Sequence, residues 1–164
     1  MSHQNSVFSE VENLLEEKNF TVDKVDKSRP WGGFFVIEED QAERFIKEFF
    51  PHVPLESFSI FSKLSPKMLI VEPEKRLSWQ YHNRRSEVWR VVKGNVGIVM
   101  SETDEQTPVT KVSEGEYISL DKGIRHRLVG LNEWGVVAEI WQHTDPEDPS
   151  DEQDIVRLQD DYGR

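Results

Sequence analysis

Short segments with strand character follow one another through most of this 164-residue chain, without helical patterns between them. From residue 68 onward, apolar and β-branched residues cluster or alternate, and Gly, Pro, Asn or Asp stands between one segment and the next. Short, evenly spaced strands of this kind are typical of an antiparallel sandwich or barrel, so the sequence predicts an all-β fold. The predicted strands are Met68–Glu72, Leu77–His82, Glu87–Lys93, Asn95–Met100, Val109–Val112, Tyr117–Leu120, Arg125–Gly130 and Gly135–Gln142.

The two amphipathic helical patterns lie within the first fifty residues. Residues 6–18 carry one apolar stripe and a possible capping box at Ser9 and Glu12. A second amphipathic helix is predicted over residues 40–50, where Pro51 ends it.

The segments that flank the predicted barrel are more polar. Thr21–Arg29 is predicted to be a connection, Phe34–Ile37 a short strand, and Asp154–Asp160 a final turn or short helix. We therefore expect residues 1–55 to form helices and a strand that pack on the barrel. Residues 56–164 would then form the barrel and its tail, in one structural unit.

Four polar residues in the predicted strands have the spacing of a metal site. Gln80 and His82 are two residues apart on one strand, so their side chains share a face, and a turn can return Glu87 to that face. His126 lies on a later strand. An amide oxygen, two imidazoles and a carboxylate can bind a divalent cation such as zinc. A lone histidine is more often a hydrogen-bonded core residue, but the four together favour metal binding.

Composition narrows the classes of function. The chain has no cysteine, so a metal must be held by nitrogen and oxygen atoms. The formal charge of −11 argues against nonspecific binding to nucleic acid or to an anionic membrane. The amino terminus lacks the pattern of a secretory signal, and a cytoplasmic protein is expected. Basic residues gather in the middle of the chain, which suits a small anionic ligand, although ordinary surface charge is the alternative.

Two spaced motifs resemble those of the cupin superfamily of small antiparallel barrels. They are His82-x4-Glu87-x6-Gly94 and Gly115-x5-Asp121-x-Gly123-x2-His126. Within the cupins, the chain is similar to the isomerase domain of type II mannose-6-phosphate isomerases. This closer similarity extends over about residues 29–164 and rests on residues 77–82 and 85–94, on Arg29-Pro30-Trp31-Gly32 and on the terminal segment 154–164.

The resemblance implies a cupin, or double-stranded β-helix (jelly-roll), barrel with an N-terminal helical addition. It also implies a zinc-type site at Gln80, His82, Glu87 and His126, with Mn²⁺, Co²⁺, Ni²⁺ or Fe²⁺ as alternatives. The implied reaction interconverts D-mannose 6-phosphate and D-fructose 6-phosphate through a cis-enediol, and the implied assembly is a homodimer.

Three further residues are candidates for the chemistry. Arg85 shares the strand face of Glu87 and could stabilise a phosphate or an enediolate, or could simply form a salt bridge with Glu87. Glu139 lies in an apolar strand and could be the general base, a partner of a metal-binding histidine, or a rim residue. Arg127 is expected to face outward or to lie at the rim, as a weaker candidate for phosphate binding.

Two other functions remain open from the sequence. One is an isomerase or epimerase of another sugar or sugar phosphate, because the metal ligands do not encode the sugar. The other is a non-catalytic, sugar-binding cupin that keeps the metal site for stability.

Overall fold

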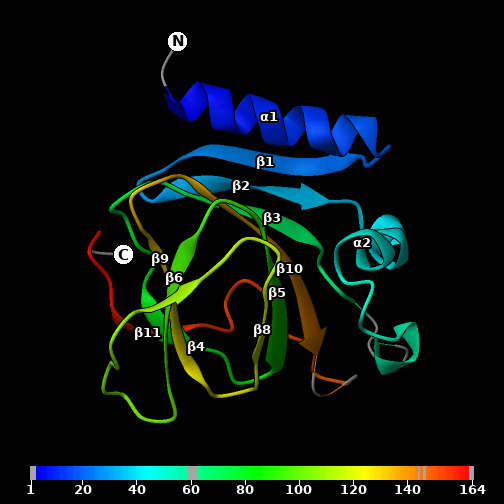
Figure 1. The fold of residues 1–164 in the computed structure, drawn as a ribbon. Coiled ribbons are helices and arrows are strands. Elements are labelled where there is room, and N and C mark those ends of the chain that lie inside the picture. Colours follow the sequence, from blue (N-terminus) through cyan, green and yellow to red (C-terminus); the bar gives the residue numbers. More distant parts are fainter. Residues whose placement is uncertain (1–2, 59–62, 144, 146, 163–164) are drawn as a thin grey trace.

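Two antiparallel sheets face each other in the computed structural model, which describes residues 3–58, 63–143, 145 and 147–162 (Figure 1). The larger sheet has the order β1 (Val22–Arg29), β2 (Gly32–Ile37), β3 (Lys67–Val71), β10 (Gly135–His143), β5 (Arg85–Lys93) and β8 (Tyr117–Leu120). The smaller sheet has the order β11 (Val156–Gln159), β4 (Trp79–Tyr81), β9 (Arg125–Gly130), β6 (Val96–Ser101) and β7 (Thr110–Val112).

An apolar core fills the space between the two sheets. Val91 and Val137 of the larger sheet belong to the same buried cluster as Ile98 and Leu128 of the smaller sheet. Alternate residues of each strand point into this space, so the polar residues that share those positions are held in an apolar environment.

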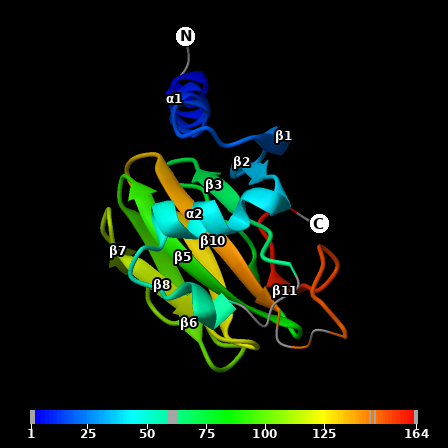
Figure 2. The same cartoon turned by 90° about the vertical axis from the view of Figure 1, so that its right-hand side faces the viewer.

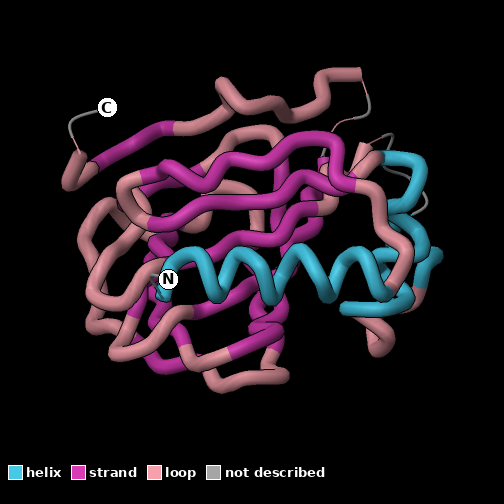
Figure 3. The backbone as a smooth tube through the Cα atoms, turned by 90° about the horizontal axis from the view of Figure 1, so that it is seen from above, coloured by secondary structure: helices cyan, strands magenta, loops and turns pink. Residues whose placement is uncertain are grey.

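Two helices cover the outer face of the larger sheet. Helix α1 (His3–Glu17) lies along the strands at the N-terminal edge, as Figures 1 and 3 show, and buries Phe8, which lies 6.1 Å from Phe35 between ring centroids. Helix α2 (Ala42–Phe49) lies in front of β10 and β5 in Figure 2 and buries Phe45. Two 3₁₀ turns flank it, η1 (Glu39–Gln41) and η2 (Leu55–Phe58). None of the described helices is long and apolar enough to cross a membrane.

The predicted elements are mostly present. Each of the eight strands expected after residue 68 has a counterpart within a few residues, and both helices form. The capping box was wrongly placed, because α1 begins at His3 and Ser9 lies inside the helix.

Two strands were missed. The predicted connection Thr21–Arg29 contains β1, and the predicted turn or helix at Asp154–Asp160 contains β11. Both are edge strands with mostly exposed or half-exposed side chains, so backbone pairing with β2 and β4 holds them rather than an apolar face. Charged edge strands lack the apolar alternation by which a strand is recognised. Because β2 pairs with β3, the N-terminal strands extend the larger sheet, and the division near residue 55 stays a prediction.

Candidate metal centre

Three buried side chains meet between the sheets: His82 directly after β4, Glu87 in β5 and His126 in β9. Nε2 of His82 lies 3.5 Å from Oε2 of Glu87, and Nε2 of His126 lies 3.5 Å from Oε1 of the same carboxylate. One ligand atom of each residue lies within 4.8 Å of the others. The fold therefore gathers three of the four predicted ligands.

Main-chain carbonyls orient both imidazoles. The Asp154 carbonyl lies 2.6 Å from Nδ1 of His82, and the Ile124 carbonyl lies 3.0 Å from Nδ1 of His126. A carbonyl only accepts, so each Nδ1 carries the hydrogen and each Nε2 presents its lone pair to the centre. Burial lowers the pKa of His82 to about 4 and also lowers the pKa of His126, so both rings are neutral near pH 7, as metal ligands must be.

The carboxylate of Glu87 is ionised despite its burial. Burial alone would raise its pKa, but the positive charge of Arg85, which also donates a hydrogen bond to the carboxylate, lowers the pKa of Glu87 below its usual range. A buried anion therefore faces two neutral lone pairs.

Two ligand atoms have unmet hydrogen-bonding capacity. Oε1 of Glu87 and Nε2 of His126 are buried and have no hydrogen-bond partner among the described residues. Leaving such atoms unpaired costs about 1–3 kcal/mol each, and a cation between them would satisfy both. Nitrogen and oxygen donors without thiolate suit zinc or another divalent transition metal, so the residues fit such an ion.

The fourth predicted ligand, Gln80, lies next to the cluster, but its side-chain oxygen accepts a hydrogen bond from another residue. Its backbone pairs directly with that of His126, which places both side chains on one face of the smaller sheet. Its Oε1 accepts a hydrogen bond of 2.6 Å from the Ser78 hydroxyl. A ligand role for Gln80 stays a prediction.

Arg85 lies beside the centre and faces inward, as predicted. Its Nε donates to Oε2 of Glu87 at 2.9 Å, and its Nη2 donates to Nε2 of His82 at 3.2 Å. Nη1 donates to the Ser150 hydroxyl and the Asp151 carbonyl, and the guanidinium lies 3.6 Å from the Trp141 ring centroid. The predicted salt bridge is therefore formed. A metal that took the lone pair of His82 would displace the Nη2 contact.

A cavity of about 310 Å³ opens over this cluster. Among the residues that line it are Gln80, Arg85, Glu87, Glu139 and Trp141. Its volume lies at the lower end of the range for small-molecule sites. Glu87 is the member of the cluster that lines the cavity, so a ligand the size of a sugar phosphate would meet the candidate centre at this carboxylate.

Glu139 lies in the wall of the cavity and is 5% exposed, so the rim interpretation was wrong. Its two carboxylate oxygens accept hydrogen bonds of 2.9 Å each from the indole N–H groups of Trp89 and Trp141. Burial, followed by repulsion from Glu87, raises the pKa of Glu139 to about 7. A carboxyl group with this pKa exchanges protons near neutrality, which suits a general acid or base.

The family model described as Mannose-6-phosphate isomerase C-terminal matches residues 46–160. The chain belongs to this family. No curated protein sequence is similar enough to count as a match.

Solved structures share the cupin fold with this family member at low identity. Oxalate decarboxylase from Bacillus subtilis has a TM-score of 0.58 at 14% identity, over 85% of this chain and 31% of that one. Protein CapF of Staphylococcus aureus, which assembles capsular polysaccharide, has a TM-score of 0.55 at 15% identity, over 83% and 34%. Vicilin from Solanum lycopersicum has a TM-score of 0.53 at 20% identity, over 81% of this chain and 35% of that one. The chain spans about a third of their length, and the matches confirm the cupin barrel.

Arg127 is buried outside the cavity, where it cannot bind a phosphate of the substrate. It faces away from His126, as expected, but it is fully buried rather than exposed or at the rim. Its guanidinium donates to the carbonyls of Leu77 and Gln159 and to the side chain of Gln106. Arg127 is not among the described residues that line the cavity. Its contact with the Gln159 carbonyl instead joins β9 to the tail.

Lys67 and the C-terminal tail contribute to the site although the sequence did not predict either contribution. Lys67 begins β3, is 8% exposed and lines the cavity, whereas the predicted strand began one residue later. A lysine directly before four apolar residues was the available signal. Asp154 ties the tail to the barrel at His82 itself.

Proposed function

We propose that the chain is a metal-dependent mannose-6-phosphate isomerase. The observation that carries the proposal is the buried cluster of His82, Glu87 and His126 beneath a cavity that also holds Arg85 and Glu139, in a member of the isomerase family. The ligand chemistry supports a divalent cation, with zinc as the first choice and Mn²⁺, Co²⁺, Ni²⁺ or Fe²⁺ as alternatives.

The reaction moves one proton from C2 to C1 and one from O2 to O1, through a cis-enediol. Glu139 is the proposed base: it takes the proton from C2 and returns it to C1 on the same face. The indoles of Trp89 and Trp141 hold its two oxygens in place. When bound at His82, Glu87 and His126, a divalent cation polarises the neighbouring sugar oxygens.

Arg85 is the proposed electrostatic partner of the developing negative oxygen. Its side chain is fixed by Glu87, Ser150 and the Trp141 ring, so its donors are preorganised beside the cavity. A fixed cation of this kind stabilises charge that develops during the reaction without reorganising at that moment.

A coupled assay with mannose 6-phosphate, run with and without a chelator, tests the proposal. Turnover that disappears with the chelator and returns with Zn²⁺ supports it. Turnover of a different sugar or sugar phosphate, with none of mannose 6-phosphate, replaces it with a related isomerase or epimerase. Stoichiometric metal without turnover of any sugar in a panel replaces it with a sugar-binding cupin.

A further inference from the structure

The cavity carries more positive than negative charge, although the chain as a whole has a net charge of −11. Its lining carboxyl groups are those of Glu87, Glu139 and Glu152. Its lining cations are Lys24, Arg29, Lys67, Arg85 and Arg157. A cationic cavity in an acidic protein attracts a small anion more strongly than the rest of the surface does.

Lys67 is the most informative of these cations because it is buried. Its Nζ lies 4.9 Å from the ring centroid of Trp141 and 5.2 Å from that of Phe34. Its hydrogen-bond partner among the described residues is Oε1 of Glu152, at 3.4 Å, and the side chain of Glu152 is 79% exposed. Its charge also acts on the buried Glu139 carboxyl group. Removal of an ammonium group from water is costly, and two aromatic faces with an exposed carboxylate at this distance compensate that cost only in part. An anionic ligand would compensate it better.

A second cation lies on the same side of the cavity. The guanidinium of Arg29, at the end of β1, lies 5.5 Å from the Phe34 ring centroid, so Arg29 and Lys67 contact one aromatic ring. Nε of Arg29 lies 3.0 Å from Oδ2 of Asp26, in a pair with considerable solvent exposure. Such a pair is weak and leaves the guanidinium able to bind a ligand.

This cationic side is separated from the metal centre by the width of β10. Lys67 on β3 pairs with Glu139 on β10, which in turn pairs with Trp89 on β5, the strand that carries Glu87. Adjacent strands lie about 4.8 Å apart, so the β3 and β5 backbones are roughly 10 Å apart across the sheet. Side chains that lean into the cavity make the distance from Lys67 to Glu87 shorter than the backbone separation and comparable with the length of a six-carbon sugar phosphate. Glu139, on the strand between them, lies between Lys67 and Glu87.

Neither arginine that was a candidate for phosphate binding takes that role, because Arg85 is proposed to act at the developing negative oxygen. Arg85 is held by Glu87, Ser150 and the Asp151 carbonyl, and Arg127 lies outside the cavity. We propose that Lys67 and Arg29 form the phosphate subsite of the cavity. A phosphate bound there would place C1 and C2 of the sugar beside Glu139 and the candidate metal centre. This assignment rests on the proposed function, and it extends that function to the orientation of the substrate.

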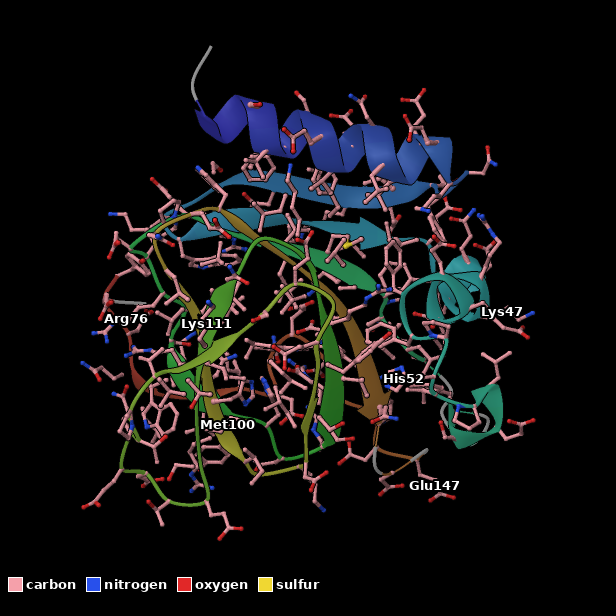
Figure 4. The ribbon with its side chains drawn as sticks, in the orientation of Figure 1. Lys47, His52, Arg76, Met100, Lys111 and Glu147 are labelled. Atoms are coloured by element: carbon pink, nitrogen blue, oxygen red, sulfur yellow. The ribbon has the colours of Figure 1, made fainter. Side chains whose placement is uncertain are left out.

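Binding and turnover measured separately test the subsite. Lys67→Gln and Arg29→Gln remove one charge each, and Lys47→Gln is the matched control, because Lys47 is exposed on α2 and points away from the barrel (Figure 4). Calorimetry on zinc-loaded protein would compare mannose 6-phosphate, mannose and inorganic phosphate. We expect Lys67→Gln to weaken mannose 6-phosphate and phosphate binding at least tenfold, with mannose affinity and metal content unchanged. Arg29→Gln should weaken the same two ligands less, and Lys47→Gln should have no effect.

The outcomes separate the subsite from the isomerase proposal. If wild type binds mannose 6-phosphate, loses that binding in Lys67→Gln and turns over no substrate, the subsite stands and the isomerase function falls. If folded Lys67→Gln binds mannose 6-phosphate as wild type does, the subsite is overturned even where turnover is normal. Wild type that binds neither phosphate compound also overturns it. Should Lys67→Gln not fold, Arg29→Gln decides: unchanged affinity for both compounds overturns the assignment.

Discussion

The main-chain carbonyl of Asp154 lies 2.6 Å from Nδ1 of His82, so the C-terminal tail holds one proposed metal ligand in place. The Asp154 carboxylate fixes that carbonyl: it accepts from the backbone N–H groups of Asn83 and Arg84 at 2.9 Å each, and from the Ser150 hydroxyl at 2.6 Å. The turn after β4 and the tail are thereby joined at the candidate metal centre.

Asp154→Ala should weaken metal binding because it removes three hydrogen bonds that hold the carbonyl against His82. Loss of such an outer partner typically lowers metal affinity about 10–100-fold. A competition titration with a chromophoric chelator measures the affinity. Asp148→Ala is the control, since Asp148 pairs with Arg84 at the surface. Equal affinity of the two variants would show that the tail does not position His82.

His126→Ala should abolish stoichiometric metal binding and turnover together. The substitution leaves two of the three clustered side chains, and it removes one of the two unpartnered buried atoms that face each other. Metal content by mass spectrometry after dialysis is the measurement. A variant that retains one zinc per chain and full activity would exclude His126 as a ligand.

Much of this centre could be predicted because strand spacing converts directly into shared faces. The offsets among Gln80, His82 and Glu87, with His126 on a second strand, sufficed to bring three ligands together. Lys67 could not be placed, because its role depends on pairing with Glu139, and strand order is a tertiary property. The predicted position of Arg127 was wrong for a related reason. Residue 106 and β11 cover its guanidinium, and the sequence predicted no strand at β11.

Arg85→Ala should leave the metal in place and reduce turnover about 10²–10³-fold, as is typical when a fixed charge beside the reacting atoms is removed. Arg85→Lys should recover little, because a lysine cannot reproduce the forked contacts to Glu87 and Ser150. Steady-state kinetics on zinc-loaded variants is the measurement. Arg85→Ala with a wild-type rate would mean that the salt bridge with Glu87 is the whole role of Arg85.

Phe45→Ala should destabilise the fold and spare the metal centre. Phe45 is fully buried on α2, with ring centroids 5.7 Å from Phe20 and 4.7 Å from Phe49, on the outer face of the larger sheet. Truncation of a buried Phe costs about 3–5 kcal/mol in the free energy of unfolding. Urea unfolding measures it. A loss below about 1 kcal/mol would mean that α2 does not contribute to the stability of the barrel.

Glu139 should give opposite pH dependences to turnover and to stability. As a base, Glu139 must be ionised, so turnover should rise with pH. Its pKa of about 7 reflects burial first and Glu87 second, and a cation bound at Glu87 offsets the second cause. The midpoint for turnover of zinc-loaded protein should therefore lie below about 7. Glu139→Gln should lose turnover by at least about 10²-fold at every pH while it retains metal.

The stability contribution of the same group has the reverse sign, because the pKa is raised in the folded state. The protonated form is favoured on folding, so the contribution is complete below the ordinary pKa of 4.5 and is lost progressively up to about 7. In metal-free protein, the difference in unfolding free energy between wild type and Glu139→Gln should thus fall by roughly 3 kcal/mol over that window. Urea unfolding at a series of pH values measures this difference, and the subtraction removes the opposing titration of the buried histidines. A difference that stays constant from pH 4.5 to 7 would refute the raised pKa.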